Sequence, residues 1–356
     1  MSVERKFDRE LEVVVPVQPL AESVIYAHST RIADFATPAI ERVLQPGTEL
    51  PEHVVRIQVR TGDTQTHAEL HEAPHAPIGR LKHEIKRALH RNVPRIDLHD
   101  QFAMDMRFSF MGNYAHLIHD VLAPLRFIEQ TLLKDGEITP TAIHVILPKA
   151  APSLALSLLE FAGVPTLCTD GVVGAHLISI TQELNLSHLP SLVHQPFVPS
   201  PAVVQERVFV SRRGLRSLLN EEEVTDYLRG EGFERVYTED LSFADQWTLL
   251  ANAREVVGIH GAGLSSLGFS SHRPRTEQPR FALTELFSPG FVTTCFRTYA
   301  AVLGGHWVGV RGKMTPEVIR DLDLLEKTRA HENASFEVDI ESLSEAVRHS
   351  RSKVRS

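Results

Sequence analysis

Cysteine is scarce in this sequence: Cys168 and Cys295 are the only two in 356 residues, and no Cys-x-x-Cys pair occurs. Cysteines so few and so widely spaced argue against a disulfide framework and against a cysteine zinc site. They favour a reducing compartment.

Basic charge is also lacking, because 37 Lys and Arg face 45 Asp and Glu and leave a formal net charge of -8. Nucleic-acid-binding surfaces normally carry a basic excess, so we expect no nucleic acid as a partner. Long apolar runs are missing as well, since no stretch reaches the length of about 18 residues that a membrane span needs. The N-terminal "MSVERKFDRELEVVV" has no apolar core of a signal peptide. These absences predict a cytoplasmic protein.

The composition that is present is that of a globular protein, 42% hydrophobic and 23% charged. The length suffices for two domains of roughly 150 residues each. Histidine is frequent, with 19 residues, and its densest group is His67, His71 and His75. Pro74 and Pro77 break any helix there, so we interpret this segment as a solvated loop and predict no metal site.

Strand-like and helix-like segments alternate with short links through the C-terminal part of the chain. Apolar runs at 207–211, 254–261 and 280–288 are typical of strands, and the stretches between them show apolar spacing of three and four residues. This alternation is typical of a doubly wound parallel sheet. We therefore predict a Rossmann-like domain over residues 201–312.

The rest of the chain divides around a proline-rich stretch at 194–206, which is typical of a linker. Residues 96–195 repeat the strand-then-helix pattern and predict a second α/β domain. Residues 1–95 alternate apolar and polar positions, so we expect a β-rich N-terminal extension that packs on this first domain. Residues 313–356 hold two amphipathic patterns and are expected to form C-terminal helices.

The stretch "VVGIHGAGLSSLGFSS" places Gly258, Gly261 and Gly263 between a predicted strand and a predicted helix. The backbone N–H groups of such a loop, together with the helix N-terminus, form an anion site. The spacing Gly-x-x-Gly-x-Gly is not the dinucleotide fingerprint, and no Walker Gly-Lys-Ser/Thr follows. Glu285 nevertheless lies 22 residues after Gly263, where a ribose-binding acid would lie. A nicotinamide enzyme therefore stays open, as does a tight turn with only a packing role.

Three arginines favour the phosphate interpretation. Arg212, Arg213 and Arg216 follow the predicted strand 207–211, at the same edge of the sheet as the glycine loop. Guanidinium groups bind phosphate oxygens through paired hydrogen bonds. Three of them beside a glycine loop predict a diphosphate site.

Three blocks of sequence, in this order, resemble glycosyltransferase family 61. The second, "VSRRGLRSLLNEEEV", is similar to the pattern Ser-Arg…Arg…Asn-Glu-x-Glu, and the third joins "GIHGAGLSSLGF" to "TELF". The first, "NYAHLIHD", is similar to the family's Asn-Tyr-x-His-x-x-x-Asp through Asn113, Tyr114, His116 and Asp120.

The resemblance implies a GT-B architecture, in which two Rossmann-like domains face each other across a cleft. Residues 96–195 would bind the acceptor and residues 201–312 the nucleotide sugar. It also implies inverting transfer from a nucleotide sugar, with a UDP-sugar favoured, to a glycan or lipid-linked acceptor. The pathway would be bacterial capsular-polysaccharide biosynthesis, and we expect no metal ion or other cofactor. A lipid-linked acceptor would add peripheral contact with the inner face of the membrane.

The resemblance also implies which side chains hold the donor. Glu285 would take the ribose hydroxyls, and His260 would either bond the diphosphate or a sugar hydroxyl or hold the loop. The residues expected to bind substrate are Asn113, Arg212, Arg216, His260, Gly261, Ala262, Gly263 and Glu285.

The base that removes the acceptor proton is expected in the first block. On a helix His116 and Asp120 share a face, so the carboxylate can orient the imidazole and raise its basicity. The match to the family block predicts His116 or Asp120 as the catalytic residue, with His119 as the second choice. Pro124 is expected to interrupt this helix.

Other function classes stay open on the sequence alone. A nucleotide-sugar epimerase of the same fold would bind the same diphosphate but would need no acceptor. A nicotinamide oxidoreductase would need a glycine loop of different spacing, and a non-catalytic partner in glycan synthesis would bind without turnover.

Overall fold

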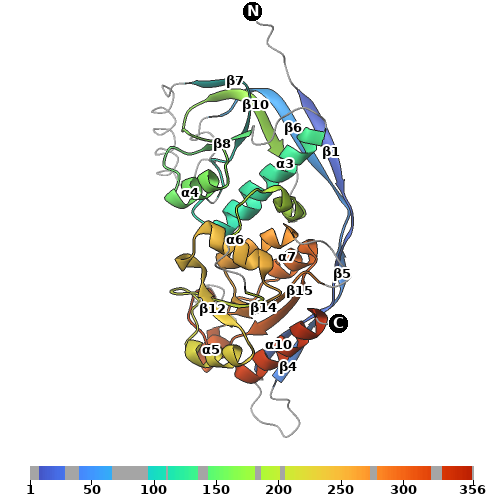
Figure 1. Cartoon of the computed structure of the whole chain (residues 1–356), viewed down its shortest axis with the longest axis vertical. Coiled ribbons are helices and arrows are strands. Elements are labelled where there is room, and N and C mark those ends of the chain that lie inside the picture. The colour runs from blue at the N-terminus through green and yellow to red at the C-terminus, as the bar shows by residue number, and fades with distance from the viewer. Residues whose placement is uncertain are drawn as a thin grey trace, which may run out of the picture. The chain divides into compact units, whose positions relative to one another are not determined.

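The computed structural model describes residues 8–28, 40–65, 95–109, 111–134, 143–180, 186–200, 205–272, 279–321 and 331–354. It is an α/β protein of two compact units (Figure 1). The first unit comprises Met1–Pro16 and Glu52–Pro196, and the second comprises Val17–Pro51 and Phe197–Ser356. The last change of unit, after Pro196, falls within the predicted linker.

The first unit is built on a six-stranded sheet of order β1-β6-β10-β7-β8-β9. From β7 the chain adds β8 and β9 on one side and then returns to place β10 on the other side, all four being parallel. The strand order therefore reverses between β7 and β10, and we call this position the switch point of the unit. The strands are β1 (Arg9–Val15), β6 (His53–Asp63), β7 (Ile96–Asp105), β8 (Ile143–Leu147), β9 (Thr166–Cys168) and β10 (Val173–Ile180).

The crossover from β7 to β8 contains an irregular helix. Three helical elements follow one another directly. They are the short α2 (Tyr114–His116), the π-helical η1 (Leu117–Leu122) and the regular α3 (Ala123–Lys134). Pro124 has no N–H to offer the preceding turn, and the amide of Ala123 instead reaches back to the carbonyl of Ile118. The predicted interruption near Pro124 is thus confirmed, in the form of a π-turn. The unit also contains α4 (Ser153–Phe161) and η2 (Leu189–His194).

The second unit is built on a seven-stranded sheet of order β12-β11-β13-β14-β15-β3-β4. Its strands β11 to β15 are parallel, and their order reverses between β11 and β13, which is the switch point of this unit. The predicted Rossmann-like alternation is confirmed here. The strands are β3 (Ser23–His28), β4 (Ile40–Gln45), β11 (Arg207–Ser211), β12 (Glu234–Tyr237), β13 (Glu255–Ile259), β14 (Ala282–Phe287) and β15 (His306–Arg311). A separate ribbon pairs β2 (Gln18–Leu20) with β5 (Thr48–Leu50).

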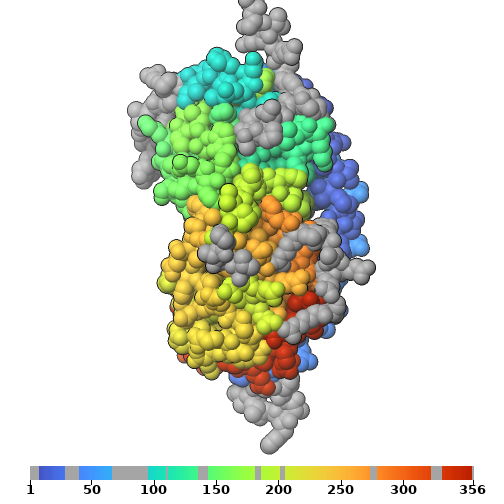
Figure 2. All heavy atoms as spheres, in the orientation of Figure 1, coloured from blue at the N-terminus to red at the C-terminus, as the bar shows by residue number. Residues whose placement is uncertain are grey.

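Helices cover both faces of the second sheet (Figure 1). On one face α5 (Glu221–Gly230) and α10 (Ile340–Val354) bury apolar side chains against the strands and lie side by side, yellow against red in Figure 2. The other face carries α6 (Phe243–Asn252), the 3-10 helix η4 (Ala262–His272) and α7 (Cys295–Leu303). Trp247 of α6 stacks on Phe269 of η4 with ring centroids 4.0 Å apart. The short η3 (Thr238–Asp240) and α8 (Pro316–Asp321) complete the unit.

The prediction that residues 1–95 pack on the first domain is wrong for residues 17–28 and 40–51. Strand β3 pairs in parallel with β15, so this segment extends the second sheet. Arg297 of α7 holds it in place, because one guanidinium nitrogen donates to the carbonyls of Ala21, Gln45 and Pro46. The predicted strands at the ends of this extension, β1 and β6, do belong to the first unit.

Two further findings concern the described residues. None of their helices combines the length and the apolar character that crossing a membrane requires. No group of three or more His, Cys, Asp and Glu side chains among them could hold a metal ion. His67, His71 and His75 lie outside the described residues.

Candidate functional site

A pocket of about 250 Å³ opens at the switch point of the second unit. Its walls are the carboxyl ends of β11 and β13, the segment after β12 and the start of η4. Ligands of doubly wound sheets bind outside the carboxyl ends of the strands at this position. The lining residues include Arg212, Arg213, Thr238, Glu239 and the run Gly261–Gly263.

The glycine loop forms one wall of this pocket. Leu264 donates its amide to the carbonyl of Gly261 as η4 begins. The preceding amides, those of Gly261, Ala262 and Gly263, have no acceptor within the described part of the chain. A side chain at position 261 would lie 2.6 Å from Arg212 Nη1, and one at 263 would lie 2.5 Å from Thr238 Oγ1. A Cβ at position 261 would therefore displace the Arg212 guanidinium, and one at position 263 would collide with the short side chain of Thr238.

Arg212 and Arg216 concentrate positive charge beside the loop. Arg212 Nη1 donates to the carbonyl of His260 at 3.0 Å. Burial lowers the pKa of Arg212, and the charge of Arg216 lowers it further. Burial also lowers the pKa of Arg216, whose guanidinium lies 5.6 Å from the Phe291 ring centroid.

Neither arginine has a carboxylate of the described residues within ion-pairing distance, and the charges of Glu239 and Glu332 act on Arg212 and Arg216 from further away. Arg216 Nε is buried without a hydrogen-bond partner among these residues. Two partly buried, mutually repelling cations with spare donors create an environment suited to an anion.

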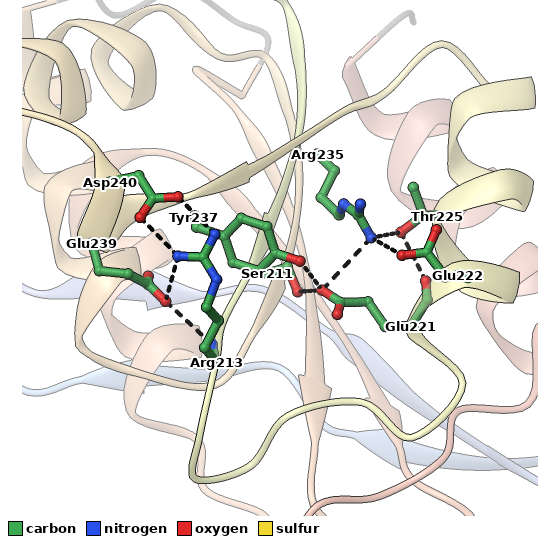
Figure 3. A network of polar contacts seen from close by, with 9 residues as sticks. All are labelled: Ser211, Arg213, Glu221, Glu222, Thr225, Arg235, Tyr237, Glu239 and Asp240. Carbon is green, nitrogen blue, oxygen red and sulfur yellow. Dashed lines mark hydrogen bonds and ion pairs between the residues drawn. The ribbon is translucent and has the colours of Figure 1, made fainter.

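Arg213, the third predicted arginine, is neutralised by its neighbours (Figure 3). Its guanidinium makes two hydrogen bonds of 2.7 Å to the carboxylate of Asp240 and lies 3.8 Å from the centroid of the Tyr237 ring. Its amide also donates to Glu239. The sequence places three arginines near the glycine loop and predicts Arg212 and Arg216 as the substrate-binding ones, and these are the two that have no carboxylate within ion-pairing distance among the described residues.

Other residues of the second sequence block have a scaffolding role (Figure 3). Glu221 accepts hydrogen bonds from Ser211 and from the hydroxyl of Tyr237, and so joins α5 to β11 and β12. Arg235 binds Glu222 at 2.7 Å on the same side of the sheet. This network fixes the strand ends from which Arg212 and Arg213 project.

His260 is held by a buried carboxylate. Its Nδ1 lies 2.6 Å from Glu285 Oε1, and Trp307 Nε1 donates to Glu285 Oε2 at 2.6 Å. The His260 ring also stacks on Phe287. Burial raises the pKa of Glu285, and the hydrogen bond from His260 opposes this rise.

The predicted contact of Glu285 with ribose hydroxyls does not fit this geometry. The Glu285 side chain is fully buried, and both of its oxygens are engaged by His260 and Trp307. The structure makes it a residue that orients His260.

The first sequence block lies on the irregular helix of the first unit. His116 Nδ1 is 2.7 Å from Asp120 Oδ2, and these side chains are 41% and 48% exposed. The predicted pairing on one helix face is confirmed. Asn113 uses its side-chain oxygen to cap α2 by accepting the amide of Ala115 at 2.9 Å, and its contact with substrate stays a prediction.

His119, the second choice for the base, is a buried residue. Burial lowers its pKa to about 3, with smaller contributions from His188 and His116. Its carbonyl accepts a hydrogen bond from His188, whose pKa burial lowers to about 4. A base so weak and so enclosed suits a scaffold better than proton transfer.

The sequence patterns did not predict that Trp307 and Thr238 belong to this site. Trp307 lies on β15, two residues before Gly309, which is the residue that pairs with Glu285. The missing side chain of Gly309 leaves room for the indole. Thr238 packs on Gly263 after β12. Their neighbours come from other strands, so no local motif signals either residue.

Comparison with known proteins agrees with the sequence blocks. A family model described as Glycosyltransferase 61 matches residues 114–276, just under half of the chain. This region begins at the irregular helix that carries His116 and Asp120 and runs past the glycine loop. No curated protein matches the chain. Residues 114–276 are therefore similar to glycosyltransferase family 61, in agreement with the resemblance that the sequence blocks indicate.

Proposed function

We propose that the protein is an inverting glycosyltransferase that moves a sugar from a nucleoside-diphosphate sugar to a glycan or lipid-linked acceptor. The observation that carries this proposal is Arg212 beside the amides of Gly261–Gly263 at the switch point of the second unit, with the charge of Arg216 close enough to lower the pKa of Arg212. In a GT-B arrangement the second unit would be the donor domain and the first unit the acceptor domain.

The donor diphosphate would accept hydrogen bonds from the loop amides and lie against the two guanidinium groups. As the bond between the anomeric carbon and the diphosphate breaks, negative charge grows on the leaving phosphate. Donors already fixed around that charge stabilise the transition state without reorganising. In this proposal the arginines supply the charge that a divalent ion supplies in other transferases, so transfer needs no metal or other cofactor.

His116 and Asp120 would activate the acceptor. Because His116 Nδ1 faces Asp120, its Nε2 is the nitrogen that can accept a proton. The acceptor hydroxyl oxygen forms the new bond to the anomeric carbon, its proton passes to His116, and the electron pair of the broken bond leaves with the diphosphate. Attack opposite the leaving group inverts the anomeric centre.

UDP is the favoured nucleotide, and capsular-polysaccharide synthesis on the cytoplasmic side of a bacterial membrane is the proposed setting. This setting would bring the protein into peripheral contact with a membrane when the acceptor is lipid-linked.

Thermal unfolding with UDP, GDP, CMP and NAD, with and without EDTA, tests the proposal on the wild type and on Arg212→Ala. A ligand at a hundredfold excess over its Kd stabilises the folded state by about 2.7 kcal/mol. We expect a shift with UDP that survives EDTA and disappears in the variant. Arg213→Ala is the matched control and should keep the shift, because Asp240 already neutralises that arginine.

Other outcomes would redirect the proposal. A shift with NAD alone would point to a nicotinamide enzyme and contradict the transferase. Interconversion of a bound UDP-sugar without any acceptor would favour an epimerase, and loss of the shift in EDTA would contradict metal independence.

A further inference from the structure

The first unit has a pocket of its own, of about 700 Å³, at its switch point. Its walls include the carboxyl ends of β7 and β10, through Met104 and the run Leu177–Ile180. These strands are parallel neighbours, with Ile178 opposite Met104. A doubly wound sheet binds its ligands at this position, so the pocket has the location of a ligand site within its own unit.

Seven of the fifteen residues that line this pocket are apolar, and most of its surface is apolar, while the other eight residues are polar or charged. Side chains from both strand ends meet those of the segment after β7 and the start of α3. One of them, Phe108, is 61% exposed, which is unusual for a large aromatic side chain beside a cavity. The apolar members are Met104, Met106, Phe108, Pro124, Leu177, Ile178 and Ile180.

Charged groups around the pocket are already paired, one pair being buried and the other exposed. Asp105 binds the buried guanidinium of Arg107 at 2.6 Å, and Asp63 binds Arg95 at 2.8 Å. Arg107 also donates to two backbone carbonyls, so its donors are used within the protein. Arg60 borders the pocket from an exposed position on β6, where water screens its charge. Such a lining favours an uncharged, apolar ligand.

Asp120 of the irregular helix contributes to the same wall. It is the carboxylate that holds His116, so a ligand in the pocket places its polar end next to the proposed base. The apolar lining and this dyad are therefore two parts of one site.

We propose that this pocket binds the apolar, non-sugar part of the acceptor, so that the acceptor is a glycoside with an apolar aglycone. This inference rests on the proposed transferase function and names its acceptor class. The sugar of the acceptor would lie toward Asp120 and His116, and the aglycone would lie between β7 and β10.

Calorimetric titration of the full chain with matched glycosides tests the proposal. Methyl and octyl glycosides of glucose, galactose and N-acetylglucosamine, kept below their micelle concentrations, differ within each pair only in the aglycone. We expect the octyl member to bind at least tenfold more tightly, since each buried methylene contributes about fourfold. Phenyl glycosides form a second arm and distinguish an aromatic aglycone from an alkyl one.

Two variants locate the binding. Phe108→Asp and Ile180→Asp should each remove most of the preference for the octyl or phenyl member. Val14→Asp is the matched control, because Val14 is 58% exposed on the same sheet and does not line the pocket. It should keep the preference.

An aglycone that adds no affinity in the wild type would overturn the proposal. A preference that survives both aspartate variants would also overturn it, because the apolar part would then bind elsewhere. The thermal shift with UDP reports separately on the second unit. If UDP binds but the octyl group adds no affinity, the transferase proposal stands and the aglycone proposal fails. If the octyl group adds affinity but UDP does not bind, the transferase proposal fails and the apolar pocket remains.

Discussion

At position 261 a single methyl group decides whether the candidate donor site can form. The Cβ of an alanine there would lie 2.6 Å from Arg212 Nη1, closer than a carbon and a nitrogen can approach. Gly261→Ala should therefore displace the guanidinium and weaken UDP binding about as much as Arg212→Ala, as measured by calorimetry.

Gly230→Ala is the matched control for this glycine, since nothing lies within 4 Å of its would-be Cβ. It should keep UDP affinity and raise the free energy of unfolding by about 0.5–1 kcal/mol, because alanine is the better helix residue. Unchanged UDP binding in Gly261→Ala would contradict the placement of the donor phosphates.

Glu285 is predicted to set the tautomer of His260. Trp307 Nε1 can only donate a hydrogen bond. In Glu285→Gln it should therefore bind the oxygen of the new amide, which leaves the NH₂ group facing His260 Nδ1. The neutral ring must then accept at Nδ1 and carry its proton on Nε2, the reverse of the wild type. Nitrogen NMR of the imidazole reports which nitrogen is protonated.

A second substitution checks this explanation. Adding Trp307→Phe to Glu285→Gln removes the obligate donor, so the amide can rotate and the Nδ1-protonated form should return. If Glu285→Gln alone leaves the proton on Nδ1 of His260, the Trp307 indole does not fix the orientation of the side chain at position 285.

At the scale of the elements, local sequence patterns predicted much of the fold. Apolar periodicity predicted the strand and helix alternation from β11 to β15, and Pro124 predicted the interruption that became the π-turn. The same patterns predicted Arg212, the glycine loop and the His116–Asp120 pair. They could not predict that Asp240 neutralises Arg213 or that Trp307 closes off Glu285, because these contacts join different strands.

Two buried histidines, His119 in η1 and His188 directly before η2, make the first unit sensitive to acid. The pKa of His188 is lowered from 6.5 to about 4 by burial, so the unfolded chain binds a proton at this site that the folded chain refuses. Above pH 6.5 His188 is neutral in both states. As the pH falls from 6.5 toward 4, protonation of the unfolded chain at this site lowers the free energy of unfolding.

His188→Gln should reduce the slope of the free energy of unfolding against pH by roughly 1.4 kcal/mol per pH unit. The glutamine amide still offers a donor to the carbonyl of His119. Urea unfolding at several pH values between 7 and 5 measures the slope, separately from any constant loss of stability. An unchanged slope would show that another group is responsible.

At the scale of the whole molecule, the chain passes between the units after Pro16, Pro51 and Pro196. The sequence could not predict that the chain enters the second unit before β3 and leaves it after β4. The contacts that hold β3 there join residues far apart in the chain, such as Ser23 and Trp307, which are 284 positions apart. A short apolar strand carries no signal that says which sheet it will join.

This topology predicts that residues 197–356 do not fold alone. Without β3, the edge of β15 is unpaired, and Arg297 loses the carbonyls of Ala21, Gln45 and Pro46. An exposed parallel edge recruits other chains, so this fragment should elute as aggregates in size-exclusion chromatography.

Residues 17–51 joined to 197–356 by a flexible Gly-Ser linker provide the control and should elute as a monomer. A monomeric 197–356 fragment with the thermal midpoint of the full chain would contradict the role of β3.

The pairing of β3 with β15 also has a consequence for how the protein is made. Strand β3 leaves the ribosome early, whereas β15 follows some 280 residues later. At about 5–20 residues per second, β3 waits on the order of a quarter of a minute to a minute for its partner. During that interval β3 can pair with β4 on one edge, while its other edge stays open to foreign strands until β15 has been synthesised.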